Sequence, residues 1–158
     1  MRIIEIYPET VSDGYGIRYA IYFAGCSHGC PGCHNPEGQN PDTGDELTDR
    51  FFDIICNEIN GNPLLDGVTL SGGDPMYRAD ELLDFLQKLR SRTSCNVWCY
   101  TGYTLEECCS DPVRRECLKH IDVLVDGRYV EALRDPRLDF RGSSNQRIIR
   151  LDEIRDQL

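Results

Sequence analysis

The chain has 158 residues, with 27 Asp and Glu against 17 Lys and Arg, and a formal net charge of −10 at pH 7. This length is typical of one domain with one core, so we expect a single domain over residues 1–158. The acidic balance, without any stretch dense in Lys or Arg, argues against binding to nucleic acid. No signal peptide and no apolar run of membrane-spanning length is visible, which predicts a cytoplasmic protein that does not associate with membranes.

Predicted strands and helices alternate along the chain. Runs rich in β-branched and aromatic residues predict strands at 2–6, 17–24, 67–73, 96–103 and 121–127, with a last short strand within 139–151. Helical periodicity predicts helices at 47–61 and 78–92, and one helix or two short helices broken near Pro112 at 104–120. In the first helix, one broad apolar face is expected to contain Phe51, Phe52, Ile54, Ile55 and Ile59.

This alternation indicates βαβ units and a mostly parallel sheet, that is, an α/β fold. Four or five such strands are too few to close an eight-stranded barrel. An open, partial βα barrel and a doubly wound sheet both fit, and both bind ligands at the carboxyl ends of the strands. The polar motifs follow predicted strands and therefore belong to that edge: CSHGCPGC, SGGDP, YTGY and VDGRY.

Three of the nine cysteines, Cys26, Cys30 and Cys33, have the spacing C-x3-C-x2-C. In a reducing compartment, clustered cysteines indicate metal ligands or catalytic groups rather than disulfides. A structural zinc site completed by His28 or His34 is one interpretation, although such sites usually draw on two separate knuckles. The other is a [4Fe-4S] cluster, in which three thiolates leave one iron open. The amino and carboxylate groups of S-adenosylmethionine are a suitable chelate for that iron.

The motifs together resemble those of the radical S-adenosylmethionine enzymes. The cysteine spacing resembles the family's cysteine motif, and SGGDP resembles its Gly-Gly-Glu motif, with Asp74 in place of Glu. One branch, the activating proteins of anaerobic ribonucleoside-triphosphate reductases, is similar over about residues 10–150. The motifs shared in order and spacing are TVSDGYGIRYAIYFAGCSHGCPGCHNP, LSGGDP, YTGY, DVLVDGRYV and RGSSNQR. The resemblance implies the open, partial barrel of the radical S-adenosylmethionine type.

The resemblance also implies roles for individual residues. Cys26, Cys30 and Cys33 would ligate one [4Fe-4S] cluster, with S-adenosylmethionine rather than a histidine at the fourth iron. Backbone at Gly32 and His34 would approach the adenine, and Asp74 would accept a hydrogen bond from the amino group. The full set of implied cofactor contacts is Gly32, Cys33, His34, Gly72, Gly73, Asp74, Thr101 and Asp126. Two alternatives stay open: ordinary turn chemistry explains Gly-Gly-Asp, and Asp126 is equally suited to cap a helix.

The implied activity is that of an enzyme whose chemistry resides in its cofactors. One electron from the reduced cluster cleaves S-adenosylmethionine to methionine and a 5′-deoxyadenosyl radical. That radical removes a hydrogen atom from a backbone glycine of the large catalytic subunit of the reductase, and a flavodoxin-type protein is the implied electron donor. The alternatives are an activase of another glycyl-radical enzyme, such as pyruvate formate-lyase, and a non-catalytic zinc-binding module.

Two features receive no catalytic role from the sequence. The other six cysteines lack a C-x2-C pair, which favours small buried apolar side chains: Cys56, Cys95, Cys99, Cys108, Cys109 and Cys117. The segment RGSSNQ, residues 141–146, is either a solvated loop or a turn that faces the cofactor or the partner.

Overall fold

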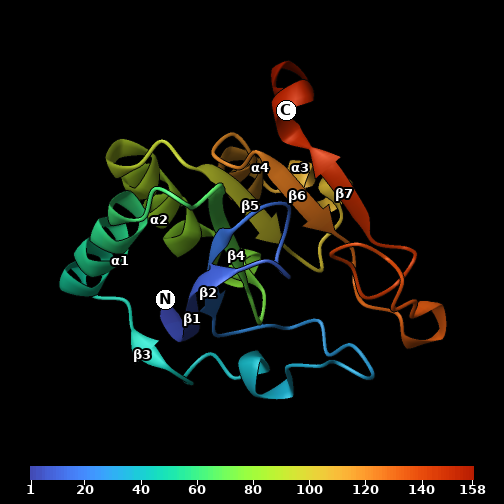
Figure 1. The fold of residues 1–158 in the computed structure, drawn as a ribbon. Helices are drawn as coiled ribbons and strands as arrows, with labels where there is room; N and C mark the ends of the chain where they lie inside the picture. Colours follow the sequence, from blue (N-terminus) through green and yellow to red (C-terminus); the bar gives the residue numbers. More distant parts are fainter.

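A computed structural model describes residues 1–158, apart from the side chain at position 157. It contains a seven-stranded sheet in the order β3-β1-β2-β4-β5-β6-β7 (Figure 1). Strands β2, β4, β5 and β6 are parallel, and β1, β3 and β7 pair antiparallel with their neighbours. The strand bounds are β1 Arg2–Thr10, β2 Arg18–Phe23, β3 Asp45–Glu46, β4 Gly67–Gly72, β5 Asn96–Tyr100, β6 Val123–Asp126 and β7 Arg147–Arg150.

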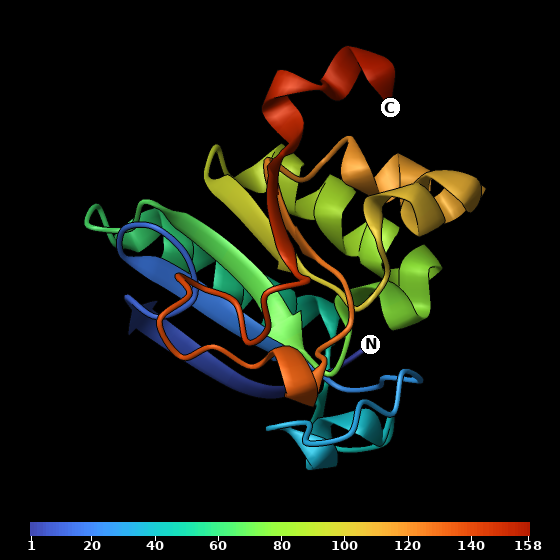
Figure 2. The ribbon, with the colours of Figure 1, turned by 90° about the vertical axis from the view of Figure 1, so that its right-hand side faces the viewer.

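The helices cover one face of this sheet (Figure 2). They are α1 Asp49–Gly61, α2 Ala79–Arg92, α3 Leu105–Ser110 and α4 Pro112–Leu118. Because the parallel strands lie side by side in chain order and their crossovers share one hand, every crossover places its helix on the same side. The doubly wound alternative is therefore wrong, and an open, mostly parallel α/β sheet is confirmed.

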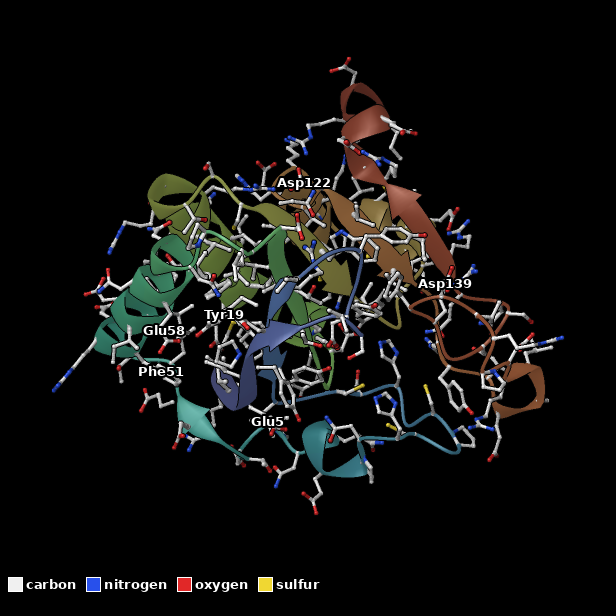
Figure 3. All side chains as sticks on the ribbon, in the orientation of Figure 1. Glu5, Tyr19, Phe51, Glu58, Asp122 and Asp139 are labelled. Carbon is white, nitrogen blue, oxygen red and sulfur yellow. The ribbon has the colours of Figure 1, made fainter. Side chains whose placement is uncertain are left out.

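The main core lies between the sheet and the helices. It contains alternate residues of the strands, such as Ile21, Leu70 and Leu124, packed against the apolar faces of the helices. Tyr19 on β2 also reaches across this layer, where its hydroxyl donates a hydrogen bond to Glu58 on α1 (Figure 3). The core thus ties the carboxyl ends of the strands to a rigid helical layer.

Helix α1 begins where Thr48 Oγ1 accepts a hydrogen bond from Phe51 N at 3.2 Å, which satisfies one of the free amides of the first turn. Its buried stripe differs from the expected one, because Ile54 is 46% exposed and Cys56 takes a place in the core. The prediction for Ile54 is wrong. The buried residues of α1 are Phe52, Ile55, Cys56 and Ile59.

The opposite face of the sheet has no helical layer and is covered by loops. The segment 127–146, between β6 and β7, crosses this face (Figure 2). It places Phe140 against Trp98 of β5 and Tyr15, with ring centroids 5.8 and 4.9 Å apart. Beneath them Arg18 is buried and donates hydrogen bonds to Thr69 Oγ1 at 2.7 Å and to a β4 carbonyl. This face is therefore aromatic and polar, as a ligand-binding face needs to be.

The strands and helices expected from the sequence are all present, and the region 104–120 forms two helices that meet at Pro112. Two features go beyond the expectation: β1 extends to Thr10, and the two-residue strand β3 is added, so that the sheet has seven strands rather than six. Within the described residues, no helix is long and apolar enough to cross a membrane.

Candidate functional site

The cysteine loop, residues 24–35, starts at the carboxyl end of β2. Backbone bonds hold its first part, from Gly25 N to Gly38 O at 2.8 Å and from Cys26 N to Gln39 O at 3.2 Å. A turn closes its second part, because Cys33 N donates to Cys30 O at 3.1 Å. The three thiols of the loop are free and partly buried, and burial raises the pKa of Cys26. In the part of the chain that the structure describes, no three Cys, His, Asp or Glu side chains converge as a preformed metal site.

The SGGD turn, residues 71–74, packs directly on the start of the cysteine loop. Gly73 N donates to Phe23 O at 2.7 Å, and Asp74 N donates to Gly25 O at 2.8 Å. A Cβ atom at Gly73 would lie 2.5 Å from Gly25 O, so a side chain does not fit there. Gly72 has a φ of +113°, which favours glycine. The glycine pair therefore allows two backbone segments to pack closely, a role independent of any cofactor.

Asp74 joins three segments of the site. Its carboxylate is 2% exposed. Oδ1 accepts from Met76 N at 2.8 Å, which caps the following short helix. Oδ2 lies 2.6 Å from His28 Nε2, 3.0 Å from Thr101 Oγ1 and 3.0 Å from the amide of residue 102. The predicted site residues Asp74 and Thr101 are thus in direct contact, beside the cysteine loop.

Sequence reasoning missed the contact between His28 and Asp74. The sequence offers His28 only as a possible metal ligand. In the structure its ring also lies 4.5 Å from that of Tyr103, which is far along the chain. The available signal was a polar aromatic side chain between two cysteines, with no apolar neighbours in sequence. The structure shows that His28 anchors the cysteine loop to the carboxyl ends of β4 and β5.

Asp126 lies at the end of β6 and faces α3 and β7. Its carboxylate is 1% exposed and accepts hydrogen bonds from Arg147 Nε at 3.0 Å, Arg147 Nη2 at 2.5 Å and Leu105 N at 2.7 Å. The bond to Leu105 N satisfies an amide of the first turn of α3, so the helix-capping alternative is confirmed. Asp126 borders a hollow separate from the pocket that Gly32 and His34 line.

That pocket has a volume of about 510 Å³ and lies on the open face of the sheet. Gly32 and His34 of the cysteine loop form one part of its wall, and Ser71 at the end of β4 forms another. Side chains of the sheet and of the segment 127–146 complete it, including Asp13, Tyr22, Tyr100, Tyr129, Phe140 and Arg141. A nucleoside-sized ligand has room in this volume.

Comparison with known proteins gives a consistent result. Residues 12–149 match a family described as "4Fe-4S single cluster domain". The anaerobic ribonucleoside-triphosphate reductase-activating protein of Escherichia coli K12 is 35% identical over 150 residues, which cover 92% of this chain and 96% of that protein. The chain belongs to this family of activating proteins. The protein of the same name from Haemophilus influenzae is 36% identical, with 95% and 98% covered, and that of phage T4 is 32% identical, with 94% and 93% covered.

Membership of the activating-protein family favours an iron–sulfur cluster over zinc, and the cysteine loop fits such a group. Its donor set is three thiols, the ligand type that iron–sulfur clusters take. Gly29 has a φ of +60°, and no atom lies within 4 Å of the place where its Cβ would be. The loop is therefore open on that side, where a bulky inorganic group needs space.

In this member of the family, the segment RGSSNQ is structural as well as pocket-lining. Gln146 accepts hydrogen bonds from Gly142 N at 2.9 Å and Ser143 N at 3.1 Å, and donates to Gly127 O at 3.0 Å. Ser143 is fully buried, and its hydroxyl accepts from Val130 N at 3.1 Å. These bonds tie the two ends of segment 127–146 together, and three residues of RGSSNQ line the pocket, which favours the turn over a free solvated loop.

Proposed function

We propose that this chain, as a single domain, activates an anaerobic ribonucleoside-triphosphate reductase by generating a glycyl radical on its large catalytic subunit. The observation that carries the proposal is the full-length similarity to activating proteins combined with a three-cysteine loop at the carboxyl end of a parallel strand. The open sheet, with helices on one face and a pocket on the other, supports the partial barrel of the radical S-adenosylmethionine type.

Cys26, Cys30 and Cys33 are the proposed ligands of one [4Fe-4S] cluster, with S-adenosylmethionine at the remaining iron. When bound, the cluster supplies the electron that reductive cleavage of the sulfonium requires. The chain positions the cluster ligands, because the contact between His28 and Asp74 holds the cysteine loop against the ends of the central strands. No general acid, base or nucleophile is needed from the protein.

Asp74 is the proposed partner of the amino group of S-adenosylmethionine. Its Oδ1 accepts only from Met76 N, so it keeps an acceptor position for an ammonium group. Gly72 and Gly73, which precede Asp74, allow the backbone of this turn to pack against the start of the cysteine loop. The further proposed contacts are Gly32, Cys33 and His34 in the cysteine loop and Thr101 after β5, but not Asp126, which caps α3.

With S-adenosylmethionine bound, the chain would have to exclude water and other hydrogen donors from the site. The segment 127–146 lines the pocket on the open face. A segment of the large reductase subunit is the proposed visitor to this pocket. A flavodoxin-type protein is the proposed source of the electron. The relatives' common name favours the reductase over other glycyl-radical enzymes as the partner.

The proposal is tested by anaerobic reconstitution with iron and sulfide. We expect about four irons and four sulfides per chain, reductant-dependent release of 5′-deoxyadenosine, and a glycyl-radical signal by electron spin resonance when the reductase is added. Cys30→Ala should abolish cleavage, whereas Cys109→Ala, which removes a partly buried thiol on α3, should not. Stoichiometric zinc without iron–sulfur absorption, or cleavage retained in Cys30→Ala, contradicts the proposal. A radical on pyruvate formate-lyase instead of the reductase identifies the other activase class.

A further inference from the structure

Two arginines line the pocket on the open face, although the whole chain has a net charge of −10. Arg134 and Arg141 line it, and neither forms an ion pair with any acidic side chain that the structure describes. The acids of the same pocket are already engaged. Asp13 accepts hydrogen bonds from neighbouring hydroxyls, and Asp135 pairs with Arg137 at 2.9 Å. The pocket therefore offers free cations to a ligand.

Arg141 is the half-buried member of this pair, and its guanidinium is held in place. Nη1 donates to the carbonyl of Gln146 at 3.2 Å, and Gln146 is itself fixed by its bond to Gly127 O. Nε is shielded from solvent and has no acceptor among the described groups. No hydrogen bond of the described residues uses Nη2 either. The unused edge of Arg141 is therefore the one formed by Nε and Nη2.

This edge has a definite chemical preference. Nε–H and Nη2–H point in parallel, and a carboxylate presents two coplanar oxygens that accept both bonds at once. A buried donor without an acceptor is unfavourable, so a ligand oxygen that accepts a hydrogen bond from Nε stabilises the bound state. The carboxylate of Asp13 in the same pocket disfavours a dianion such as phosphate. A singly charged, planar anion fits these conditions best.

We propose that Arg141 binds a carboxylate of the pocket's ligand side-on, through Nε and Nη2. The proposed function, on which this inference rests for the identity of the ligand, offers two sources. One is the amino-acid end of S-adenosylmethionine, and the other is an acidic group of the reductase segment that enters the pocket. In either case Arg141 fixes the orientation of the ligand that binds beside the cysteine loop. Gly32 and His34 of that loop line the same pocket.

The test measures binding on the full-length chain with its reconstituted cluster. The variants are Arg141→Gln, Arg141→Lys and the control Arg128→Gln, which changes a side chain of the same segment that is 56% exposed and outside the pocket. Anaerobic equilibrium dialysis gives dissociation constants for S-adenosylmethionine and for its decarboxylated form. Surface-immobilised reductase gives the affinity for the partner, and circular dichroism verifies that each variant is folded.

If S-adenosylmethionine supplies the carboxylate, Arg141→Gln weakens its binding about 10- to 100-fold and leaves binding of the decarboxylated form unchanged. The affinity of Arg141→Lys lies between those of wild type and Arg141→Gln, because an ammonium group carries the charge but cannot donate two parallel hydrogen bonds. If the reductase supplies it, S-adenosylmethionine binding is unchanged and reductase affinity falls by a similar factor. Arg128→Gln behaves as wild type in both cases.

Equal affinities of wild type and Arg141→Gln for both ligands overturn the inference. So does an equal loss for S-adenosylmethionine and its decarboxylated form, which indicates a changed pocket shape. Both results require a wild-type chain that binds its ligands, so they leave the proposed function intact. A wild-type chain that assembles no cluster and binds neither ligand contradicts the proposed function and this inference together.

Discussion

Replacing Asp126 with asparagine removes a buried charge that joins β6, α3 and β7. The carboxylate accepts three hydrogen bonds, from Arg147 Nε, Arg147 Nη2 and Leu105 N, and an asparagine side chain has one acceptor oxygen for them. Breaking a fully buried ion pair costs about 3–5 kcal/mol. Arg147 is 47% exposed and stays hydrated and bound to Glu106, so we expect a loss of about 2 kcal/mol in the free energy of unfolding.

Urea unfolding of the cluster-free chain, followed by circular dichroism, measures this change, and thermal unfolding should show a decrease of about 4–8 °C in Tm. The matched control is Glu106→Gln, which removes the exposed acid that contacts the same arginine at 2.8 Å and should change stability much less. Equal stability of Asp126→Asn and wild type would refute the reasoning. If S-adenosylmethionine binding fell at the same time, the carboxylate would act on the cofactor and not on the fold.

Three further predictions follow from described contacts. Hydrogen bonds from Arg147 lower the pKa of Glu106 from 4.5 to about 2. The ionised Glu106 therefore stabilises the fold above pH 4.5, and this stabilisation is lost as the pH falls towards 2. In that window, the unfolding free energy of Glu106→Gln should depend less on pH than that of wild type. Removing His28 with alanine frees the cysteine loop from Asp74, and hydrogen exchange of loop amides should become faster, whereas unchanged exchange contradicts the anchoring role. Burial raises the pKa of Cys108 to about 12. Iodoacetamide at pH 8 should therefore modify the loop thiols of the folded, cluster-free chain and leave Cys108 unmodified. Mass spectrometry should find the same protection for Cys56, Cys99 and Cys117, which are also buried.

The sequence predicted the repeating part of the fold well because each βα unit carries its own periodicity. The run of β-branched and aromatic residues in 17–24 and the helical spacing in 78–92 both report local burial. The two-residue strand β3 has no such pattern, since only its pairing with β1 makes it a strand. Ile54 was misplaced because a broad apolar face does not show where the stripe that contacts the sheet ends.

The candidate site was predictable where its residues stand together in the sequence. The three cysteines and Gly-Gly-Asp are contiguous motifs at strand ends. By contrast, the contacts of His28 with Asp74 and of Asp126 with Arg147 join segments that meet only in the folded chain. The pocket wall formed by residues 127–146 was predictable only as one of two alternatives for RGSSNQ, because polar loop composition does not distinguish a hydrogen-bonded loop from a solvated one.

The order of strands in the sheet follows their order in the chain, apart from the short β3 at one edge. Each new βα unit therefore pairs with a strand that has already been synthesised. Assembly during synthesis can proceed unit by unit from the first hairpin. The cysteine loop and the turn at Asp74 belong to the early units, whereas the segment that covers the pocket lies after β6. A growing chain thus completes the cysteine loop and its anchor at Asp74 before the segment that lines the pocket is made.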